Sequence, residues 1–256
     1  MTVFDTSSAR ERAVGLDAAV SALGRGELVV LPTDTVYGVG ANAFDPAAVE
    51  VLQAAKGRGR DKPPPVLVGD LAVLPALTTD LPPSAHALAE RFWPGALTLV
   101  CRAQPALSWD LGDTRGTVAV RMPDHALARE LLGRAGPTAV SSANRTGRPA
   151  PSTCTDAREQ LGESVAVYLD GGAVGGGQPS TILDLTGDRV RVLRLGALSL
   201  AELAEVVPEL AEDEASGPDS HVGADASGQD ASGPDAGAGP DPSSGSDTDA
   251  GAPAPA

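Results

Sequence analysis

The chain alternates between segments with a helical spacing of apolar residues and short continuous apolar runs. Apolar positions recur with a helical period over residues 9–24 and the pattern stops at Gly24. Asp45 followed by Pro46 is typical of an N-cap with proline in the first turn, and predicts a helix through residue 55. Three further helices are expected after N-caps at Ser84, Asp124 and Ser199, over residues 84–92, 126–132 and 199–207.

The short apolar runs between these helices predict β-strands. The expected strands cover residues 27–31, 66–68, 96–101, 117–121, 138–141, 165–169, 181–185 and 190–193. Strands interleaved with helices favour an α/β fold in which helices pack against a sheet.

The composition changes at residue 211. Ala, Ser, Gly, Pro and Asp dominate from there on, and Ala-Ser-Gly-(Pro/Gln)-Asp recurs at 215–219, 226–230 and 231–235. Such a segment has too little apolar surface to offset the conformational entropy lost on folding. We therefore predict one domain over residues 1–210 and a disordered tail over 211–256.

The charge of the chain is concentrated in this tail. Residues 211–256 hold ten acidic residues and no lysine or arginine, so the net charge of -15 falls to -5 for residues 1–210. A domain that is not basic is a poor candidate for a general nucleic-acid binder. No membrane-spanning run or signal peptide is apparent, and the two cysteines and three scattered histidines predict neither a disulfide framework nor a metal site. We expect a cytoplasmic protein.

The densest positive charge lies in Lys56-Gly-Arg-Gly-Arg-Asp-Lys-Pro63, at the end of a predicted helix. Lys56 and Lys62 are the only lysines in a chain with seventeen arginines. Lysine supplies a compact charge and arginine a bidentate fork, and a polyphosphate binds to such groups. A solvated basic loop is the alternative.

Two polar segments follow predicted strands. In residues 31–40, Thr33 and Thr35 are candidates for binding the polar groups of a ligand, unless Asp34 and Thr35 only bond the local backbone. In residues 141–147, hydroxyl groups, an amide and a glycine are suited to binding phosphate or ribose, unless they form an ordinary loop.

Three further residues are candidates for contacting a ligand. Thr117 and Arg121 lie on one face of a strand, where a buried Arg121 needs an anionic partner, either a ligand carboxylate or an internal acid. Ser180 ends a glycine-rich loop that either closes over a ligand or simply connects two strands. Arg194 ends the last strand, where it would reach a phosphate or the solvent.

Six of these motifs, in this order, resemble the YrdC-like family of threonylcarbamoyl-AMP synthases. The resemblance covers about residues 10–200 and none of the tail. The motifs are Pro32–Gly38, Lys56–Arg58, Phe92–Gly95, Val120–Pro123, Ser142–Asn144 and Ser180–Asp184. The chain departs from the family pattern at Pro64, Leu67, Ser141, Ala150 and Leu195.

The resemblance implies a single twisted α/β sheet with a concave, positively charged site. Lys56 and Arg58 would be catalytic, with Lys56 near the phosphates or bicarbonate. The implied nucleotide contacts are Arg58, Lys62, Thr117, Ser142, Asn144 and Arg194. The implied threonine contacts are Thr35, Arg121 and Ser180, with Arg121 on the carboxylate.

The implied reaction joins L-threonine, bicarbonate and ATP into threonylcarbamoyl-adenylate and pyrophosphate, the first step of N6-threonylcarbamoyladenosine (t6A) formation at tRNA position 37. Mg2+ would enter with ATP, with no permanently bound cofactor and no protein-bound metal. The product would pass to a tRNA threonylcarbamoyl transferase, with at most weak direct RNA binding and no membrane contact. Two alternatives remain: an RNA-binding or ribosome-associated module, for which three phenylalanines offer little base stacking, and a carbamoyl-transfer relative with another acceptor.

Overall fold

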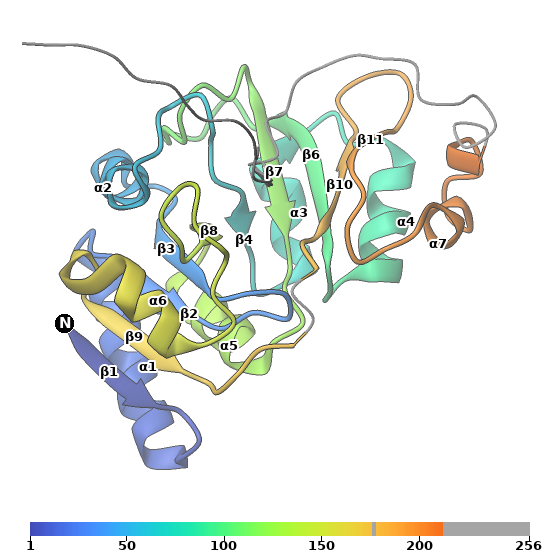
Figure 1. Ribbon diagram of the computed structural model, residues 1–256. Helices are drawn as coiled ribbons and strands as arrows, with labels where there is room; N and C mark the ends of the chain where they lie inside the picture. The colour runs from blue at the N-terminus through green and yellow to red at the C-terminus, as the bar shows by residue number, and fades with distance from the viewer. Residues whose placement is uncertain (176–177, 212–256) are drawn as a thin grey trace, which may run out of the picture. The chain divides into compact units, whose positions relative to one another are not determined.

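The computed structural model describes residues 1–175 and 178–211. One mixed, twisted sheet runs through the domain, and helices cover both of its faces (Figure 1). The strand order is β1-β9-β2-β3-β8-β4-β7-β6-β10-β11, with β5 also paired to β6. The α/β fold class is therefore confirmed, while the charge of the site face stays a prediction.

The bounds of the elements are as follows. The strands are β1 (Thr2–Asp5), β2 (Val29–Leu31), β3 (Gly38–Asn42), β4 (Val66–Leu67), β5 (Thr78–Thr79), β6 (Leu97–Ala103), β7 (Thr117–Arg121), β8 (Thr138–Ser142), β9 (Val167–Asp170), β10 (Thr181–Asp184) and β11 (Arg191–Arg194). The helices are α1 (Ala9–Gly24), α2 (Pro46–Lys56), α3 (Leu74–Leu77), α4 (Pro83–Phe92), α5 (Ala126–Ala135), α6 (Cys154–Leu161) and α7 (Leu200–Ala204).

Several helix boundaries agree with the sequence pattern because they depend on local chemistry. Helix α1 has the predicted bounds, and its N-cap Ser8 accepts a hydrogen bond from the Glu11 N–H. Asp45 caps α2 through the N–H groups of its first turn. Ser199 opens α7 with a capping box, although this helix ends at Ala204 rather than at residue 207.

Two predicted N-caps are wrong. Helix α4 begins at Pro83 after Pro82, because proline has the helical φ and needs no hydrogen-bond acceptor for its nitrogen, so Ser84 is already inside the helix. His125 rather than Asp124 is the N-cap of α5. The Asp124 carboxylate instead lies 3.9 Å from the Arg129 guanidinium group.

The sequence pattern also missed elements that long-range packing explains. Strand β3 overlaps the end of the polar segment 31–40, where no strand was predicted. A Cβ atom at Gly38 would lie 2.6 Å from Val140 Cγ1, and one at Gly40 would lie 2.9 Å from Thr138 Cγ2. Glycine is therefore required where β8 side chains cross β3, although it is a poor strand former. Strand β1 and helix α6 were not predicted either.

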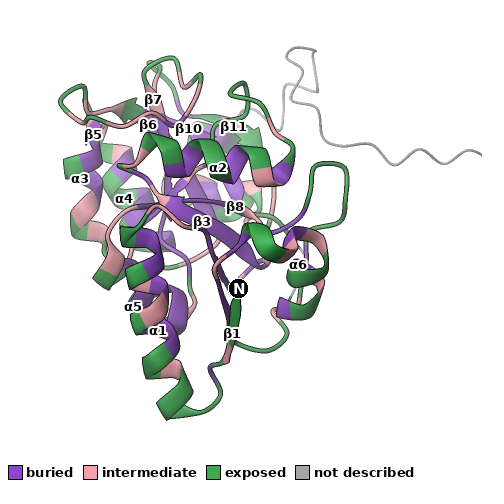
Figure 2. Ribbon diagram, turned by 90° about the vertical axis from the view of Figure 1, so that its left-hand side faces the viewer, coloured by how far each residue is buried: buried purple, intermediate pink, exposed green. Residues whose placement is uncertain are grey.

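Two apolar cores hold the sheet between its helices. One joins α1 and α5 to the sheet through residues such as Leu16, Leu131 and Leu169. The other packs α2, α4, α6 and α7 around Tyr37 and Leu99. Figure 2 shows that the buried residues follow the strands and the inner sides of the helices.

The predicted tail over residues 211–256 lies outside the described residues except for Ala211, so its disorder stays a prediction. No helix within residues 1–175 and 178–211 has the length and apolar character needed to cross a membrane.

Candidate functional site

The end of helix α2 meets the loop that follows β8. Gly57, with a φ of 63°, ends the helix in a left-handed turn. The Lys56 Nζ atom donates to the carbonyl oxygens of Ser142 and Asn144, the latter at 2.6 Å. The Lys56 carbonyl accepts the Thr146 N–H at 2.9 Å. Lys56 thus holds the β8 loop through both its side chain and its backbone.

Burial governs the electrostatics of this corner. Lys56 is 1% exposed, and burial, assisted by the Arg58 charge, lowers its pKa to about 7. Burial also lowers the pKa of Arg58. Among the described residues neither cation forms an ion pair, so an anionic ligand would supply the charge that the protein does not.

Two buried polar atoms here have no hydrogen-bond partner among the described residues: Arg58 Nε and Asn144 Oδ1. Arg58 Nη1 donates to Ser141 Oγ at 3.2 Å. The Asn144 amide nitrogen donates to the carbonyl oxygens of Arg145 and Arg148. Buried polar atoms are normally paired, so these two atoms indicate where a ligand or water binds. We call Lys56, Arg58, Ser141, Ser142 and Asn144 the α2–β8 cluster.

The turn after β2 is held by Thr33. Its hydroxyl oxygen accepts the N–H groups of Thr35 and Val36, both at 3.2 Å, and donates to the Val36 carbonyl at 2.6 Å. Thr33 therefore does the local bonding that the sequence assigned to Asp34 and Thr35. The side chains of Asp34 and Thr35 are left to point at β7.

The side chains of Asp34 and Thr35 both accept hydrogen bonds from Arg121, the last residue of β7. Its Nη2 atom donates to Asp34 Oδ1 at 2.6 Å, Nη1 to Thr35 Oγ1 at 3.2 Å, and Nε to the Gly95 carbonyl at 3.0 Å. Arg121 is 7% exposed. The internal acid that the sequence kept as an alternative is present, yet each terminal nitrogen keeps one further N–H that none of these bonds uses. We call Asp34, Thr35 and Arg121 the β7 cluster.

Ser180, at the start of β10, has a buried partner. Its hydroxyl lies 2.9 Å from Thr98 Oγ1. Arg194 donates to the Ser180 carbonyl and hydroxyl oxygens. Partial burial, followed by the charge of nearby Arg121, lowers the Arg194 pKa although its side chain is largely exposed. We call Thr98, Ser180 and Arg194 the β10 cluster.

Backbone contacts connect the α2–β8 cluster to the β7 cluster. The Ala143 N–H donates to the Tyr37 carbonyl at 2.8 Å, which ties the β8 loop to the turn that carries Thr35. Strand β4 pairs Val66 with both Val120 of β7 and Ala139 of β8. Leu67 likewise pairs with both Arg121 and Thr138, so Arg121 lies level with the start of β8, while Ser142 is the last residue of that strand.

Two predicted residues are not brought into these contacts. The Lys62 side chain is exposed and makes no ion pair among the described residues. Thr117 bonds the Thr114 carbonyl at 2.8 Å. Conversely, Asp34 and Thr98 take part in these contacts without having been predicted as ligand contacts, and Ser141 was predicted only as part of segment 141–147. A buried Arg121 calls for an acid such as Asp34, whereas Thr98 had no signal in the sequence.

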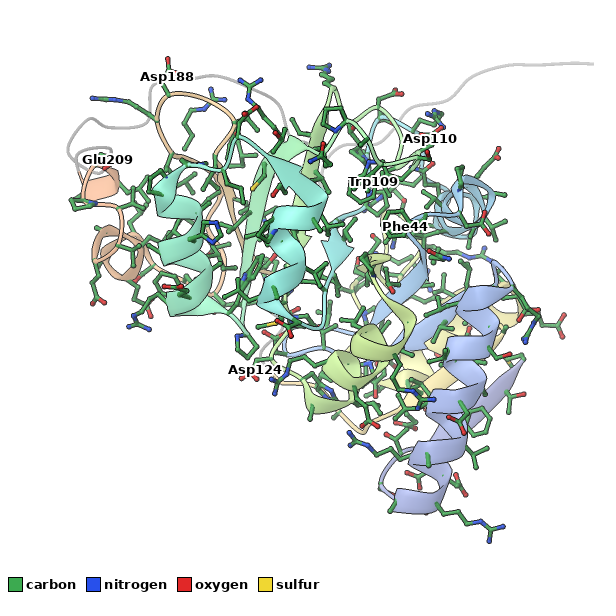
Figure 3. All side chains as sticks on the ribbon, turned by 180° about the vertical axis from the view of Figure 1, so that it is seen from behind. Phe44, Trp109, Asp110, Asp124, Asp188 and Glu209 are labelled. Carbon is green, nitrogen blue, oxygen red and sulfur yellow. The ribbon has the colours of Figure 1, made fainter. Side chains whose placement is uncertain are left out.

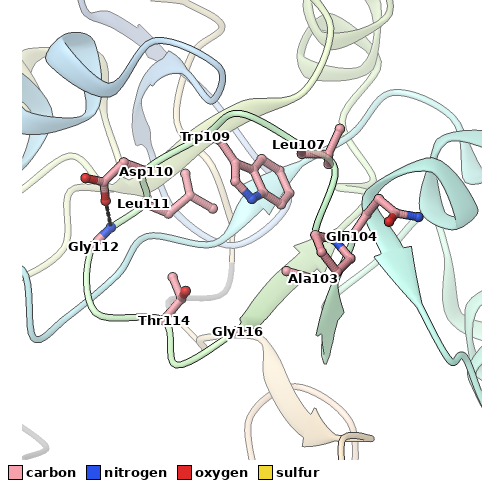
Figure 4. Close-up of a pocket in the computed structure, with 10 residues that line it drawn as sticks. Ala103, Gln104, Leu107, Trp109, Asp110, Leu111, Gly112, Thr114 and Gly116 are labelled. Atoms are coloured by element: carbon pink, nitrogen blue, oxygen red, sulfur yellow. Dashed lines mark hydrogen bonds between the residues drawn. The ribbon is translucent and has the colours of Figure 1, made fainter.

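The loop between β6 and β7 lines a pocket that is separate from the three clusters. It encloses a pocket of about 290 Å³ beside Trp109 and Leu111, lined by none of the predicted site residues (Figure 4). Trp109 stacks on Phe44, with ring centroids 5.6 Å apart (Figure 3). Arg60 pairs with Asp110 at 2.8 Å, which fastens this loop to the segment after α2.

Metal binding has no obvious protein ligands. Within residues 1–175 and 178–211, no three His, Cys, Asp or Glu side chains gather into a metal-binding group. The two cysteines are buried, and burial raises the pKa of Cys101 to about 12 and that of Cys154 to about 11. Neither thiol is an activated nucleophile.

Comparison with known proteins identifies the family. The Sua5/YciO/YrdC model, whose description reads "Telomere recombination", matches residues 21–196. This chain belongs to that family. A relative from Mycobacterium leprae is 54% identical over 205 residues, covering 80% of this chain and 93% of that protein. Threonylcarbamoyl-AMP synthase of Bacillus subtilis is 41% identical over 191 residues, covering 74% of this chain and 55% of that protein.

Solved structures of the family agree with the fold. Sua5 of Pyrococcus abyssi, in its complex with L-threonine, matches with a TM-score of 0.75 and 34% identity over 82% of this chain and 62% of that chain. Escherichia coli YciO matches with a TM-score of 0.68 over 78% of this chain and 96% of that chain, and at 24% identity supports the fold alone.

Proposed function

We propose that this chain is a threonylcarbamoyl-AMP synthase, an enzyme that uses ATP and L-threonine to make an adenylate. Relatives of that name align with most of the domain. The observation that carries the function is the arrangement of the family motifs in the α2–β8 and β7 clusters. Among residues 1–175 and 178–211, the cation-rich α2–β8 cluster has no ion pair, and the Arg121 guanidinium group keeps N–H groups that its bonds to Asp34, Thr35 and Gly95 do not use.

The β7 and β10 clusters bind the amino acid. The α-carboxylate accepts the two remaining N–H groups of Arg121, which offer the parallel pair that a carboxylate prefers. Thr35 and Ser180 orient the rest of the molecule through their hydroxyl groups. Their own partners, Arg121 and Thr98, fix the positions of these hydroxyls before the substrate arrives.

The α2–β8 cluster binds the phosphates. Arg58 and Lys56 lie where a polyanion restores the missing negative charge, and the β8 loop adds Ser142 and Asn144. ATP enters as its magnesium complex, so the metal belongs to the substrate. Thr117, Lys62 and Arg194 stay predicted nucleotide contacts.

The reaction follows from this arrangement. The threonine nitrogen bonds to the carbon of bicarbonate with loss of water and a proton, and gives a carbamate. A carbamate oxygen then bonds to the α-phosphorus of ATP while the bond to pyrophosphate breaks. No side chain forms a covalent bond in either step. The protein contributes positioning and neutralises phosphate charge.

The role of bicarbonate, delivery of the product to a tRNA threonylcarbamoyl transferase and a cytoplasmic location belong to this proposal. Pyrophosphate release from the purified chain with ATP and Mg2+ tests it. Release should require L-threonine and bicarbonate together. Absence of release from folded protein contradicts the proposal and favours the RNA-binding alternative, while release with another acceptor indicates a carbamoyl-transfer relative.

A further inference from the structure

One carboxylate oxygen of Asp34 has no hydrogen-bond partner within residues 1–175 and 178–211. Oδ1 accepts the Arg121 Nη2 atom at 2.6 Å, and Arg121 is the only ion-pair partner of Asp34 among the described residues. Asp34 Oδ2 accepts no hydrogen bond from any described residue, and the Asp34 side chain is 17% exposed to solvent. The Thr33 turn fixes the backbone on which this carboxylate is carried.

Because Arg121 Nη2 and Asp34 Oδ1 are 2.6 Å apart, the N–H groups of Arg121 and the second oxygen of Asp34 that lack partners among the described residues belong to the same small part of the site. A ligand carboxylate that binds Arg121 therefore approaches a fixed negative charge. A simple carboxylic acid would be repelled by it. In an α-amino acid, however, the ammonium group is attached to the carbon next to the carboxylate, so it can face Asp34 while the carboxylate faces Arg121.

We propose that Asp34 binds the α-ammonium group of the amino-acid substrate and selects zwitterions over simple carboxylic acids. This role rests on the proposed function and adds a residue to it. The pair Asp34–Arg121 has no net charge, and neither does a zwitterionic amino acid. Each partner of the pair thus meets the opposite charge on the ligand.

The same charge has a consequence for the reaction. When the ammonium group becomes a carbamate, the nitrogen loses one proton to solvent and one to the departing water, and it gains a carboxylate. The product of this step carries a negative charge beside Asp34. Repulsion favours rotation of the carbamate away from Asp34, toward the cations of the α2–β8 cluster.

A different role for Asp34 makes the opposite prediction. If this carboxylate only neutralises Arg121, it competes with the substrate carboxylate. Removing its charge would then free Arg121 and tighten the binding of every carboxylate, L-threonine included.

Asp34→Asn separates the two roles, because the amide oxygen still accepts from Arg121 while the amide nitrogen cannot accept from an ammonium group. We would measure Kd by titration calorimetry for L-threonine and for 3-hydroxybutyrate, which is threonine without its amino group. Asp34→Asn should weaken L-threonine by about tenfold or more and leave 3-hydroxybutyrate unchanged or tighter. If the wild-type protein binds 3-hydroxybutyrate too weakly to measure, a lower limit on that Kd is enough for the comparison. Asp188→Asn, an exposed Asp in the turn between β10 and β11, is the matched control (Figure 3).

Asp34→Glu keeps the charge and should retain the preference for L-threonine over 3-hydroxybutyrate. Equal weakening of both ligands in Asp34→Asn, or L-threonine binding that is unchanged or tighter, overturns the inference and leaves the proposed function intact. If the wild-type chain binds no amino acid, the proposed function fails and the inference fails with it.

Discussion

The α2–β8 cluster and the β7 cluster each contain a buried cation, but only the cation of the β7 cluster has an acidic partner among the described residues. Lys56 and Arg58 have no ion pair among the described residues, and burial lowers the pKa of both. Arg121 is also buried, but the Asp34 carboxylate lies 2.6 Å from its guanidinium group. A polyanion would stabilise the first cluster, whereas the second already has no net charge and would suit a ligand without net charge.

Replacing Lys56 should have the largest effect on activity. Lys56→Met removes the charge and leaves the carbonyls of Ser142 and Asn144 without their donor. We expect the rate of pyrophosphate release to fall about a hundredfold, as when one fixed donor to a developing charge is lost. Lys62→Met is the matched comparison: it removes the only other lysine, a predicted nucleotide contact at an exposed position, and should cost less than about tenfold. An equal or larger loss in Lys62→Met would contradict the larger role of the buried lysine.

Breaking the internal ion pair of the β7 cluster should show in stability. Arg121→Met leaves the Asp34 carboxylate, whose side chain is only 17% exposed, without its partner, and should lower the free energy of unfolding by about 3 kcal/mol. The double variant Arg121→Met/Asp34→Asn should recover most of the lost free energy of unfolding. It should not recover L-threonine binding. Urea unfolding of the two single variants and the double variant gives the coupling energy. Additive single effects would show that the pair does not act as a unit.

The sequence predicted an element correctly where its structure depends on neighbouring residues, and missed it where the structure depends on residues far along the chain. Helix α1 and strand β7 have the predicted bounds, because their signals lie within the segments themselves. Strand β3 was missed, because the reason for its glycines lies in Val140 and Thr138 of β8.

The site shows the same division. The resemblance to a family named the residues, but not their partners. Asp34 meets Arg121 across 87 positions and Thr98 meets Ser180 across 82. The resemblance places Lys56 near the phosphates or bicarbonate, but gives no sign that its amine also donates to two backbone carbonyls. Roles of this kind depend on tertiary contacts that no local pattern records.

The lowered pKa of Lys56 predicts how nucleotide binding depends on pH. In the free protein the amine, with a pKa of about 7 against an ordinary 10.5, is mostly neutral at pH 8. A bound phosphate favours the ammonium form and raises the pKa, so binding at pH 8 takes up a proton. Affinity for ATP should therefore fall as pH rises above 7, by at most about tenfold per pH unit.

Titration calorimetry in buffers with different ionisation enthalpies counts this proton. The uptake should disappear in Lys56→Met and persist in Lys62→Met. Uptake that survives in Lys56→Met would mean that another group titrates and that Lys56 does not face the phosphates. The β7 cluster offers the internal comparison, since L-threonine binding should not take up a proton through Lys56.

The smallest expected effect concerns a residue one contact removed from the amino acid. Thr98 is 3% exposed, and its hydroxyl lies 2.9 Å from that of Ser180. Thr98→Val keeps the shape and removes this partner, so the Ser180 hydroxyl is held less firmly. We expect KM for L-threonine to rise by about threefold to tenfold with little change in kcat, the loss of one hydrogen bond. Thr98→Ser keeps the hydroxyl and should restore KM. A fall in kcat with KM unchanged would place Ser180 near the reacting atoms instead of among the groups that hold the amino acid.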